Sequence, residues 1–135
     1  MTRSQLILLG FPRAIIIALD LSPGPKARHR TGSRGSYAPD KADEQAISWQ
    51  MRAAYRREPL AGPVALFVRF YRSDHRRVDT DNLVKRLKDA GNGIIYVDDS
   101  QVVEEHVYLE RGSDHPRTEV AFWPIEVEPE VNLLD

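Results

Sequence analysis

Residues 64–90 have the sequence VALFVRFYRSDHRRVDTDNLVKRLKDA, in which the spacing of the apolar residues changes partway along. Residues 64–72 are rich in β-branched and aromatic side chains, which is typical of a strand. From about Asp81 the apolar side chains recur at helical spacing, and the glycines of GNG at 91–93 offer the positive φ that ends many helices. The stretch therefore predicts a strand followed by an amphipathic helix.

The residues before this stretch predict one more strand and one more helix. The strand is expected at residues 14–21, AIIIALDL, where the turn-forming residues SPGP stop it. The helix is expected at about residues 41–57, with Asp40 or Asp43 as its N-cap. Its apolar stripe comprises Ala46, Ile47, Trp49 and Ala53. We expect both tryptophans of the chain, Trp49 and Trp123, in the core or at an interface.

Two strands are predicted after residue 100. Residues 101–111 alternate between apolar and polar side chains, and residues 117–125 form the last strand, paired with the previous one as a hairpin through GSDHP. The resulting order, β-α-β-α-β-β, predicts an α+β fold with a single mixed β-sheet and two helices packed on it. The short apolar run at 94–97 is expected to return along the sheet toward the start of the helix at Asp81.

Length and composition favour one domain in this chain of 135 residues. We place the domain at residues 14–125, between an N-terminal extension at 1–13 and an acidic tail at 126–135. The absence of cysteine excludes disulfides and thiolate zinc sites and fits a cytoplasmic protein. Apolar runs near the N-terminus are too short to span a membrane, which needs about 18 residues or more.

Charge is unevenly distributed although the net charge is only −1. Residues 26–77 are strongly basic, residues 78–135 are acidic, and most of the 19 basic residues are arginine. The planar fork of arginine suits phosphate, but high arginine content is also common in GC-rich coding sequences. Overall charge therefore does not argue against a nucleic-acid partner.

Carboxylates are concentrated around the predicted helix at residues 81–90. Within that helix Asp81, Lys85 and Asp89 need no more than ordinary i,i+4 pairing. Asp79 stands before it in D-x-D spacing, and Asp98 and Asp99 follow the apolar run, so we expect these carboxylates to converge. Carboxylates that are close together repel one another unless a cation lies among them or some of them are protonated. Hard oxygen ligands of this kind suit Mg²⁺ or Mn²⁺. A calcium loop is excluded, because leucine and valine occupy the positions where it needs an oxygen ligand and glycine.

The segment RRVDTDNLVKRLKDAGNGIIYVDDSQVVEEHVYL, residues 76–109, resembles the central signature of the RusA family of Holliday junction resolvases. The family pattern is a basic run, D-x-D-N, a lysine three residues on, an aspartate four beyond, and D-D-x-Q-V. All of its elements are matched, by Asp79, Asp81, Asn82, Lys85, Asp89, Asp98, Asp99, Gln101 and Val102. Gly91 stands where the family usually has leucine, a departure that does not touch the acidic set.

The resemblance implies roles for individual residues. The catalytic, metal-binding carboxylates would be Asp79, Asp81 and Asp99, with Asp98 as a further possible ligand and Lys85 stabilising charge in the transition state or orienting water. Asn82 would cap the helix or orient a carboxylate. DNA backbone contacts would come from Arg76, Arg77, Lys26, Arg28, Arg30 and Arg34. The implied assembly is a homodimer, for which the apolar run 94–97 and the strand 64–72 are candidate surfaces.

The leading hypothesis is a Mg²⁺-dependent endodeoxyribonuclease that resolves Holliday junctions by paired symmetric phosphodiester hydrolysis in DNA recombination and repair. One alternative is a non-catalytic protein that binds four-way junctions. Another is a metal-dependent nuclease that acts on other branched DNA. The expected partners are branched DNA and a second copy of the chain, with no membrane.

Overall fold

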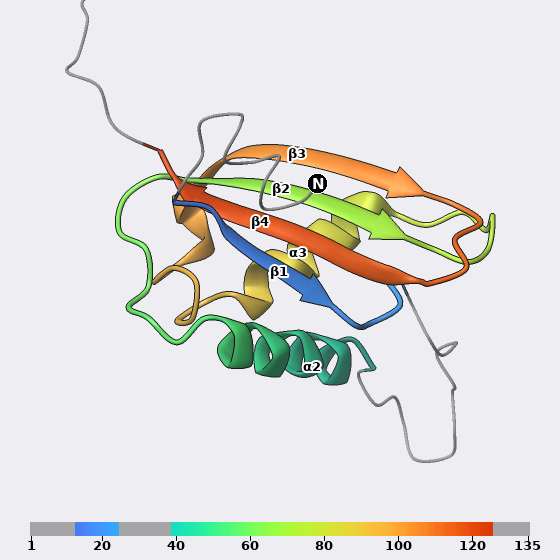
Figure 1. Ribbon diagram of the computed structural model, residues 1–135, viewed down its shortest axis with the longest axis horizontal. Coiled ribbons are helices and arrows are strands. Elements are labelled where there is room, and N and C mark those ends of the chain that lie inside the picture. The colour runs from blue at the N-terminus through green and yellow to red at the C-terminus, as the bar shows by residue number, and fades with distance from the viewer. Residues whose placement is uncertain (1–12, 25–38, 126–135) are drawn as a thin grey trace, which may run out of the picture.

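The computed structural model describes residues 13–24 and 39–125, which form a four-stranded sheet with a pair of helices covering one of its faces (Figure 1). The strand order in the sheet is β1-β4-β2-β3. The strands are β1 (Ile15–Leu19), β2 (Val64–Tyr71), β3 (Val102–Glu110) and β4 (Arg117–Pro124), and the helices are α2 (Pro39–Ala54), α3 (Thr80–Ala90) and the short 3₁₀ helix η1 (Asp99–Gln101). The predicted α+β class and the order β-α-β-α-β-β are confirmed.

The pairing of the last two strands differs from the prediction. β4 is antiparallel to both β1 and β2, whereas β3 is parallel to β2 at the edge of the sheet. The predicted hairpin between β3 and β4 is therefore wrong, because β2 lies between them. Residues 64–68 of β2 are all buried, as expected for a central strand with a paired strand at each edge. The connection crosses the end of β2, where the backbone N–H of Arg72 donates to Glu110 at 2.9 Å.

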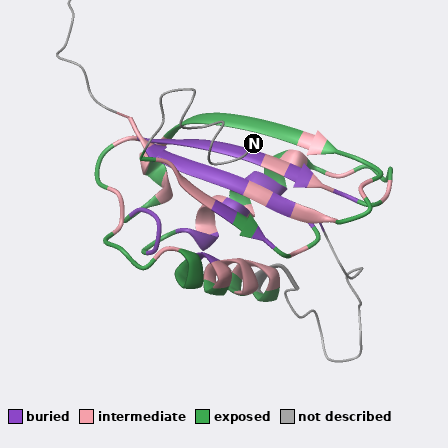
Figure 2. Ribbon diagram, in the orientation of Figure 1, coloured by how far each residue is buried: buried purple, intermediate pink, exposed green. Residues whose placement is uncertain are grey.

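The main core lies between the sheet and the helices. Most residues of β2 and β4 are buried, whereas most of β3 and the outer side of α2 are exposed (Figure 2). From the sheet the core takes Leu66, Val68 and Phe122, and α3 adds Leu83, Val84, Leu87 and Ala90. The amphipathic character predicted for this helix is confirmed. A smaller apolar cluster, which includes Phe67 and Trp123, lies on the other face of the sheet.

The prediction for the buried face of α2 was wrong. The face that packs on the core is rotated by about one residue position from the predicted apolar stripe. Met51 is fully buried and Ile47 packs against the core, but Trp49 is 65% exposed and Ala53 is also exposed. A hydrogen bond at 2.8 Å from the Ser48 hydroxyl to the Ala90 carbonyl joins α2 to α3 and sets this orientation. Asp43 lies inside the helix rather than at its cap, 3.6 Å from Arg86.

The apolar run after α3 forms a buried turn and not a strand. Ile94, Ile95 and Tyr96 are buried, and the Tyr96 hydroxyl donates to the Lys88 carbonyl at 2.6 Å. Gly91 has a right-handed φ of −82°, so the positive φ predicted for the glycines falls at Gly93, with 75°. Because the turn stays beside the end of α3, the expected return toward Asp81 does not occur. Neither this run, in which only Val97 is exposed, nor the central strand β2 offers an extended apolar dimer surface.

Candidate functional site

The start of α3 carries two of the predicted site residues. Asp79 is the N-cap of α3, and its Oδ1 accepts the backbone N–H groups of Asp81 at 3.0 Å and Asn82 at 3.4 Å. The Asn82 side chain also donates through Nδ2 to Asp79 Oδ2 at 3.0 Å. Asp79 and Asp81 are both predicted site residues, and we call them the N-terminal acidic pair. Negative charge is stabilised here by the free N–H groups and the helix dipole.

The end of α3 carries a second group of carboxylates. Asp99, the first residue of η1, accepts a hydrogen bond at 3.3 Å from Asn92 Nδ2. Asp89, in the last turn of α3, has a raised pKa, first because of its partial burial and then because of its hydrogen bond with Asp99 and the negative charges of Asp99 and Glu44; Lys85 opposes this shift. We call Asp89 and Asp99 the C-terminal acidic pair.

The adjacent aspartates 98 and 99 have different environments. Asp98 is the N-cap of η1, and its Oδ2 accepts the Ser100 backbone N–H at 3.0 Å. These hydrogen bonds lower the pKa of Asp98. Gln101 completes the cap, since its Oε1 accepts the Asp98 N–H at 3.0 Å while its Nε2 donates to the Leu60 carbonyl at 2.8 Å. The Asp98 carboxylate is therefore engaged in the cap of η1, whereas the Asp99 carboxylate contacts Asn92 in the turn after α3.

The two acidic pairs lie at opposite ends of α3. At a rise of about 1.5 Å per residue, Asp79 and Asp89 are separated by about 15 Å along the helix axis. No group of three or more His, Cys, Asp or Glu side chains within residues 13–24 and 39–125 is arranged to hold one metal ion. The convergence predicted for Asp79, Asp81 and Asp99 therefore does not occur among the described residues of a single chain. Lys85 is exposed and lies between the two pairs.

Exposed arginines precede the N-terminal acidic pair. Arg76 and Arg77 are exposed. Two hydrogen bonds hold the backbone of Arg76, one at its N–H and one at its carbonyl. Its N–H donates to Asp74 Oδ1 at 3.3 Å, and its carbonyl accepts from Arg111 at 2.5 Å. The other cations predicted to contact DNA lie outside the described residues: Lys26, Arg28, Arg30 and Arg34.

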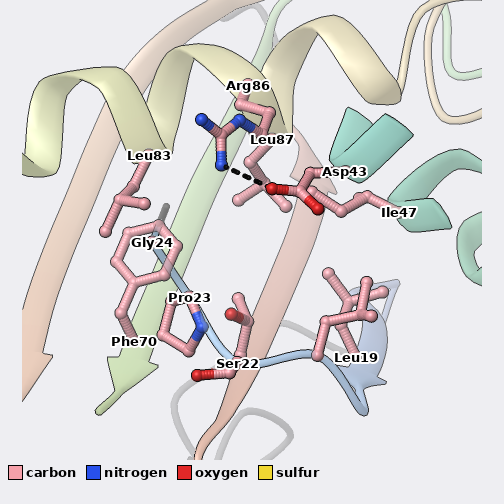
Figure 3. A pocket seen from close by; sticks show the side chains of 12 residues that line it. Leu19, Ser22, Pro23, Gly24, Asp43, Ile47, Phe70, Leu83, Arg86 and Leu87 are labelled. Atoms are coloured by element: carbon pink, nitrogen blue, oxygen red, sulfur yellow. Dashed lines mark ion pairs between the residues drawn. The ribbon is translucent and has the colours of Figure 1, made fainter. Parts of the chain in front are cut away.

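A small pocket between β1, α2 and α3 is separate from this acidic surface. Its walls are mostly apolar, and they include the ion pair between Asp43 and Arg86 (Figure 3). The enclosed volume is about 30 Å³, room for little more than one or two water molecules. None of the predicted catalytic residues lines it, and it is too small for a nucleotide.

The sequence reasoning underrated three polar residues at the end of α3. Apart from its place in the family pattern, Asp89 is predicted only as an ion-pair partner of Lys85, and no role is predicted for Asn92 or Glu44. A sequence signal existed for Asp89, because an aspartate in the last turn of a helix opposes the helix dipole. No local pattern could have placed Glu44 there, since it reaches the site through the packing of α2 on α3.

Fold and site together define a class of protein: a small α+β domain with carboxylates at both ends of one helix and exposed arginines beside them, as expected of a hydrolase that acts on DNA. Comparison with family models then gives the family. Residues 20–122 match the model described as Endodeoxyribonuclease RusA, and this match covers most of the chain. The chain therefore belongs to the RusA family of junction-resolving endodeoxyribonucleases, and it is a nuclease that cuts within DNA. No curated protein matches the sequence.

Among the described residues, neither α2 nor α3 is long and apolar enough to cross a membrane.

Proposed function

We propose that this protein is a Mg²⁺-dependent, structure-selective endodeoxyribonuclease that resolves Holliday junctions by paired symmetric hydrolysis of phosphodiester bonds, in DNA recombination and repair. The observation that carries this proposal is the C-terminal acidic pair. Asp89 and Asp99 lie against each other at the helix end where negative charge is least favourable. Two carboxylates in contact repel each other unless one is protonated or a cation lies between them, and we attribute this arrangement to metal-dependent chemistry because it does not help the fold.

The donor set fits Mg²⁺, with Mn²⁺ as a plausible substitute. Mg²⁺ usually takes one or two carboxylates from the protein and completes its octahedron with water and substrate phosphate. Asp79, Asp81 and Asp99 are the proposed metal-binding and catalytic residues, and Asp98 is the weaker candidate because it caps η1. When bound, such an ion supplies Lewis-acid polarisation of the scissile phosphate. Asn82 holds the Asp79 carboxylate in place through its side-chain hydrogen bond.

The cations are assigned to the DNA. Lys85 projects from the exposed face of α3 between the acidic pairs, where its ammonium group can stabilise charge that develops on the phosphate. Arg76 and Arg77 are proposed to contact backbone phosphates on the approach to the site. Lys26, Arg28, Arg30 and Arg34 are proposed to do the same. These contacts position the substrate without specifying its sequence.

A homodimer accounts for both the symmetry of the substrate and the separation of the acidic pairs. Two strands of a junction must be cut, and a twofold axis supplies two equivalent sites. If that axis passes near the middle of α3, the N-terminal acidic pair of one protomer faces the C-terminal acidic pair of the other. We propose that the nuclease domain spans residues 14–125, between the extension 1–13 and the tail 126–135, and that the protein acts in the cytoplasm.

The test is cleavage and binding of three labelled substrates: a four-way junction, a flap and a linear duplex, each with Mg²⁺. We expect symmetric nicking of the junction by the wild-type protein, and junction binding without nicking by Asp81→Asn. Preferred cutting of the flap would favour the nuclease that acts on other branched DNA. Junction binding without any cutting by the wild-type protein would favour the non-catalytic alternative, and nicking by Asp81→Asn would contradict the assigned site.

A further inference from the structure

A second polar surface lies where the last turns of α2 and the residues after it meet the turn that follows α3. It is an open groove of about 740 Å³ whose lining includes Trp49, Arg52, Arg56, Arg57 and Ile94. Helix α2 lies beside α3, and much of its outer side is exposed (Figure 2). We call this surface the arginine groove.

The arginine groove is connected to the acidic site through a single turn. Gly93 and Ile94, which line the groove, directly follow Asn92, and Asn92 donates to Asp99. The Ser48 hydroxyl, next to Trp49, donates to the Ala90 carbonyl at the end of α3. The groove and the C-terminal acidic pair therefore adjoin the same turn.

The cations of the groove are available for a ligand. Arg52, Arg56 and Arg57 form no ion pair with a carboxylate among the residues that the structure describes. Other surface arginines are paired, such as Arg69 with Glu110 at 2.9 Å and Arg117 with Glu119 at 3.6 Å. A group of guanidinium groups without carboxylate partners, each with a planar fork of donors, is suited to successive phosphates.

The exposed side chain of Trp49 indicates which form of DNA the arginine groove would bind. The indole is 65% exposed although large aromatic side chains are usually mostly buried. A groove that combines cations with an exposed aromatic ring is characteristic of single-strand binding, in which bases stack on the ring while the backbone follows the positive charge. Duplex DNA keeps its bases stacked inside the helix, so Trp49 requires a locally unpaired strand.

We propose that the arginine groove binds one unpaired DNA strand next to the scissile phosphate, with Arg52, Arg56 and Arg57 on its phosphates and Trp49 stacked on an unpaired base. This inference rests on the proposed function, because it places the groove at the branch point of the substrate. It assigns Trp49 to substrate binding instead of to the core or a protein interface.

The arginine contribution is tested by the salt dependence of junction binding. In Arg52→Gln/Arg56→Gln, the magnitude of the slope of log K against log salt concentration should fall by about 1.4, since each phosphate contact to a single strand contributes about 0.7. The matched control is Arg69→Gln/Arg117→Gln, which removes the same charge from the opposite face of the sheet. An equal slope change in both double variants would mean that junction binding depends only on the total charge of the protein. That result would overturn the assignment of the arginine groove to DNA binding.

The stacking contribution is tested by fluorescence with a single-stranded oligonucleotide. Emission of the wild-type protein should be quenched by the oligonucleotide, and Trp49→Phe should lose that quenching because Trp123 is buried. Trp49→Phe should retain most of the affinity, whereas Trp49→Ala should weaken binding by about 5- to 150-fold, the effect of losing one stacked base. Wild-type affinity in Trp49→Ala overturns the stacking assignment.

The two proposals fail in different ways. If the wild-type protein binds and nicks the junction while the groove variants match it in affinity, only the groove assignment is overturned. If the wild-type protein neither binds nor nicks the junction, both proposals are overturned together.

Discussion

The two ends of helix α3 use the same residue type under opposite electrostatic conditions. At the N-terminal end Asp79 caps the helix and accepts the N–H groups of Asp81 and Asn82. At the C-terminal end Asp89 and Asp99 face the negative end of the dipole and each other, and the pKa of Asp89 is raised. The first arrangement stabilises the fold, whereas the second opposes it.

The two ends of α3 therefore differ in whether their aspartates can be explained by stability of the fold. Asp79 would be favoured at its position even in a protein without activity, because aspartate is among the best N-cap residues. Stability gives no reason to place Asp89 beside Asp99. The C-terminal acidic pair is therefore the stronger indication of a metal-dependent site, and it can be tested separately from the N-terminal acidic pair.

The largest effect is expected from Asp99→Asn. Loss of a group that acts on the transition state typically costs about 10²- to 10³-fold in rate, and we expect junction nicking to fall at least that far. Asp98→Asn is the matched control: asparagine caps a helix about as well as aspartate, so nicking should stay within about threefold of wild type. The check is the single-turnover cleavage rate with Mg²⁺; equal losses in the two variants would contradict the distinction between these neighbours.

Mixing two inactive variants tests whether the two ends of α3 cooperate between protomers. In a heterodimer of Asp81→Asn and Asp99→Asn, a site built from both protomers leaves one of the two sites intact. Mixing after exchange of subunits should therefore restore single-strand nicking of the junction, while each variant alone stays inactive. If each site lies within one chain, no intact site exists in the mixture. Continued inactivity, with heterodimers shown to form, would exclude the shared site.

A smaller effect is expected on stability at the N-terminal end. Asp79→Ala removes the cap of α3 and should lower the free energy of unfolding by about 1 kcal/mol. Asp79→Asn keeps an oxygen acceptor and should cost much less, although we expect both variants to lose nicking. Urea denaturation measures the difference. Equal destabilisation by alanine and asparagine would show that the cap hydrogen bonds are not what stabilises this end.

The smallest effect is expected from Asp89→Asn, and it has the opposite sign. Because the folded-state pKa of Asp89 is raised above its ordinary value of 3.8, the folded protein binds this proton more tightly than the unfolded chain does. The favourable contribution is present below pH 3.8 and is lost as the pH rises through the folded-state pKa.

Ionised Asp89 therefore opposes folding at pH 7, and Asp89→Asn should slightly raise the Tm there. The gain should disappear in acid, where the carboxyl group of the wild-type protein is protonated. Thermal denaturation of both proteins across this pH range checks the sign. A lower Tm of the variant at pH 7 would show that the C-terminal acidic pair stabilises the fold.

Local sequence patterns predicted much of the fold. The apolar spacing of Leu83, Leu87 and Ala90 identified the buried side of α3 because a helix repeats in sequence every 3.6 residues. The same reasoning placed the second helix, α2, correctly along the chain but chose the wrong buried face for it. Contacts of Ser48 and Met51 with the rest of the fold decided that face. The same reasoning also paired β3 with β4, since nothing local shows that β2 lies between them.

The sequence by itself determined the family, the set of carboxylates, Lys85 and the amphipathic character of α3, because these depend on residue type and spacing alone. Only the tertiary structure decided that Asp98 caps η1 while Asp99 meets Asp89, and that Asp79 lies at the other end of the helix. It also left Trp49 exposed beside the three arginines of the groove. The physical reason is the same in each case: spacing fixes which residues share a helix face, whereas packing between distant segments fixes which charges meet.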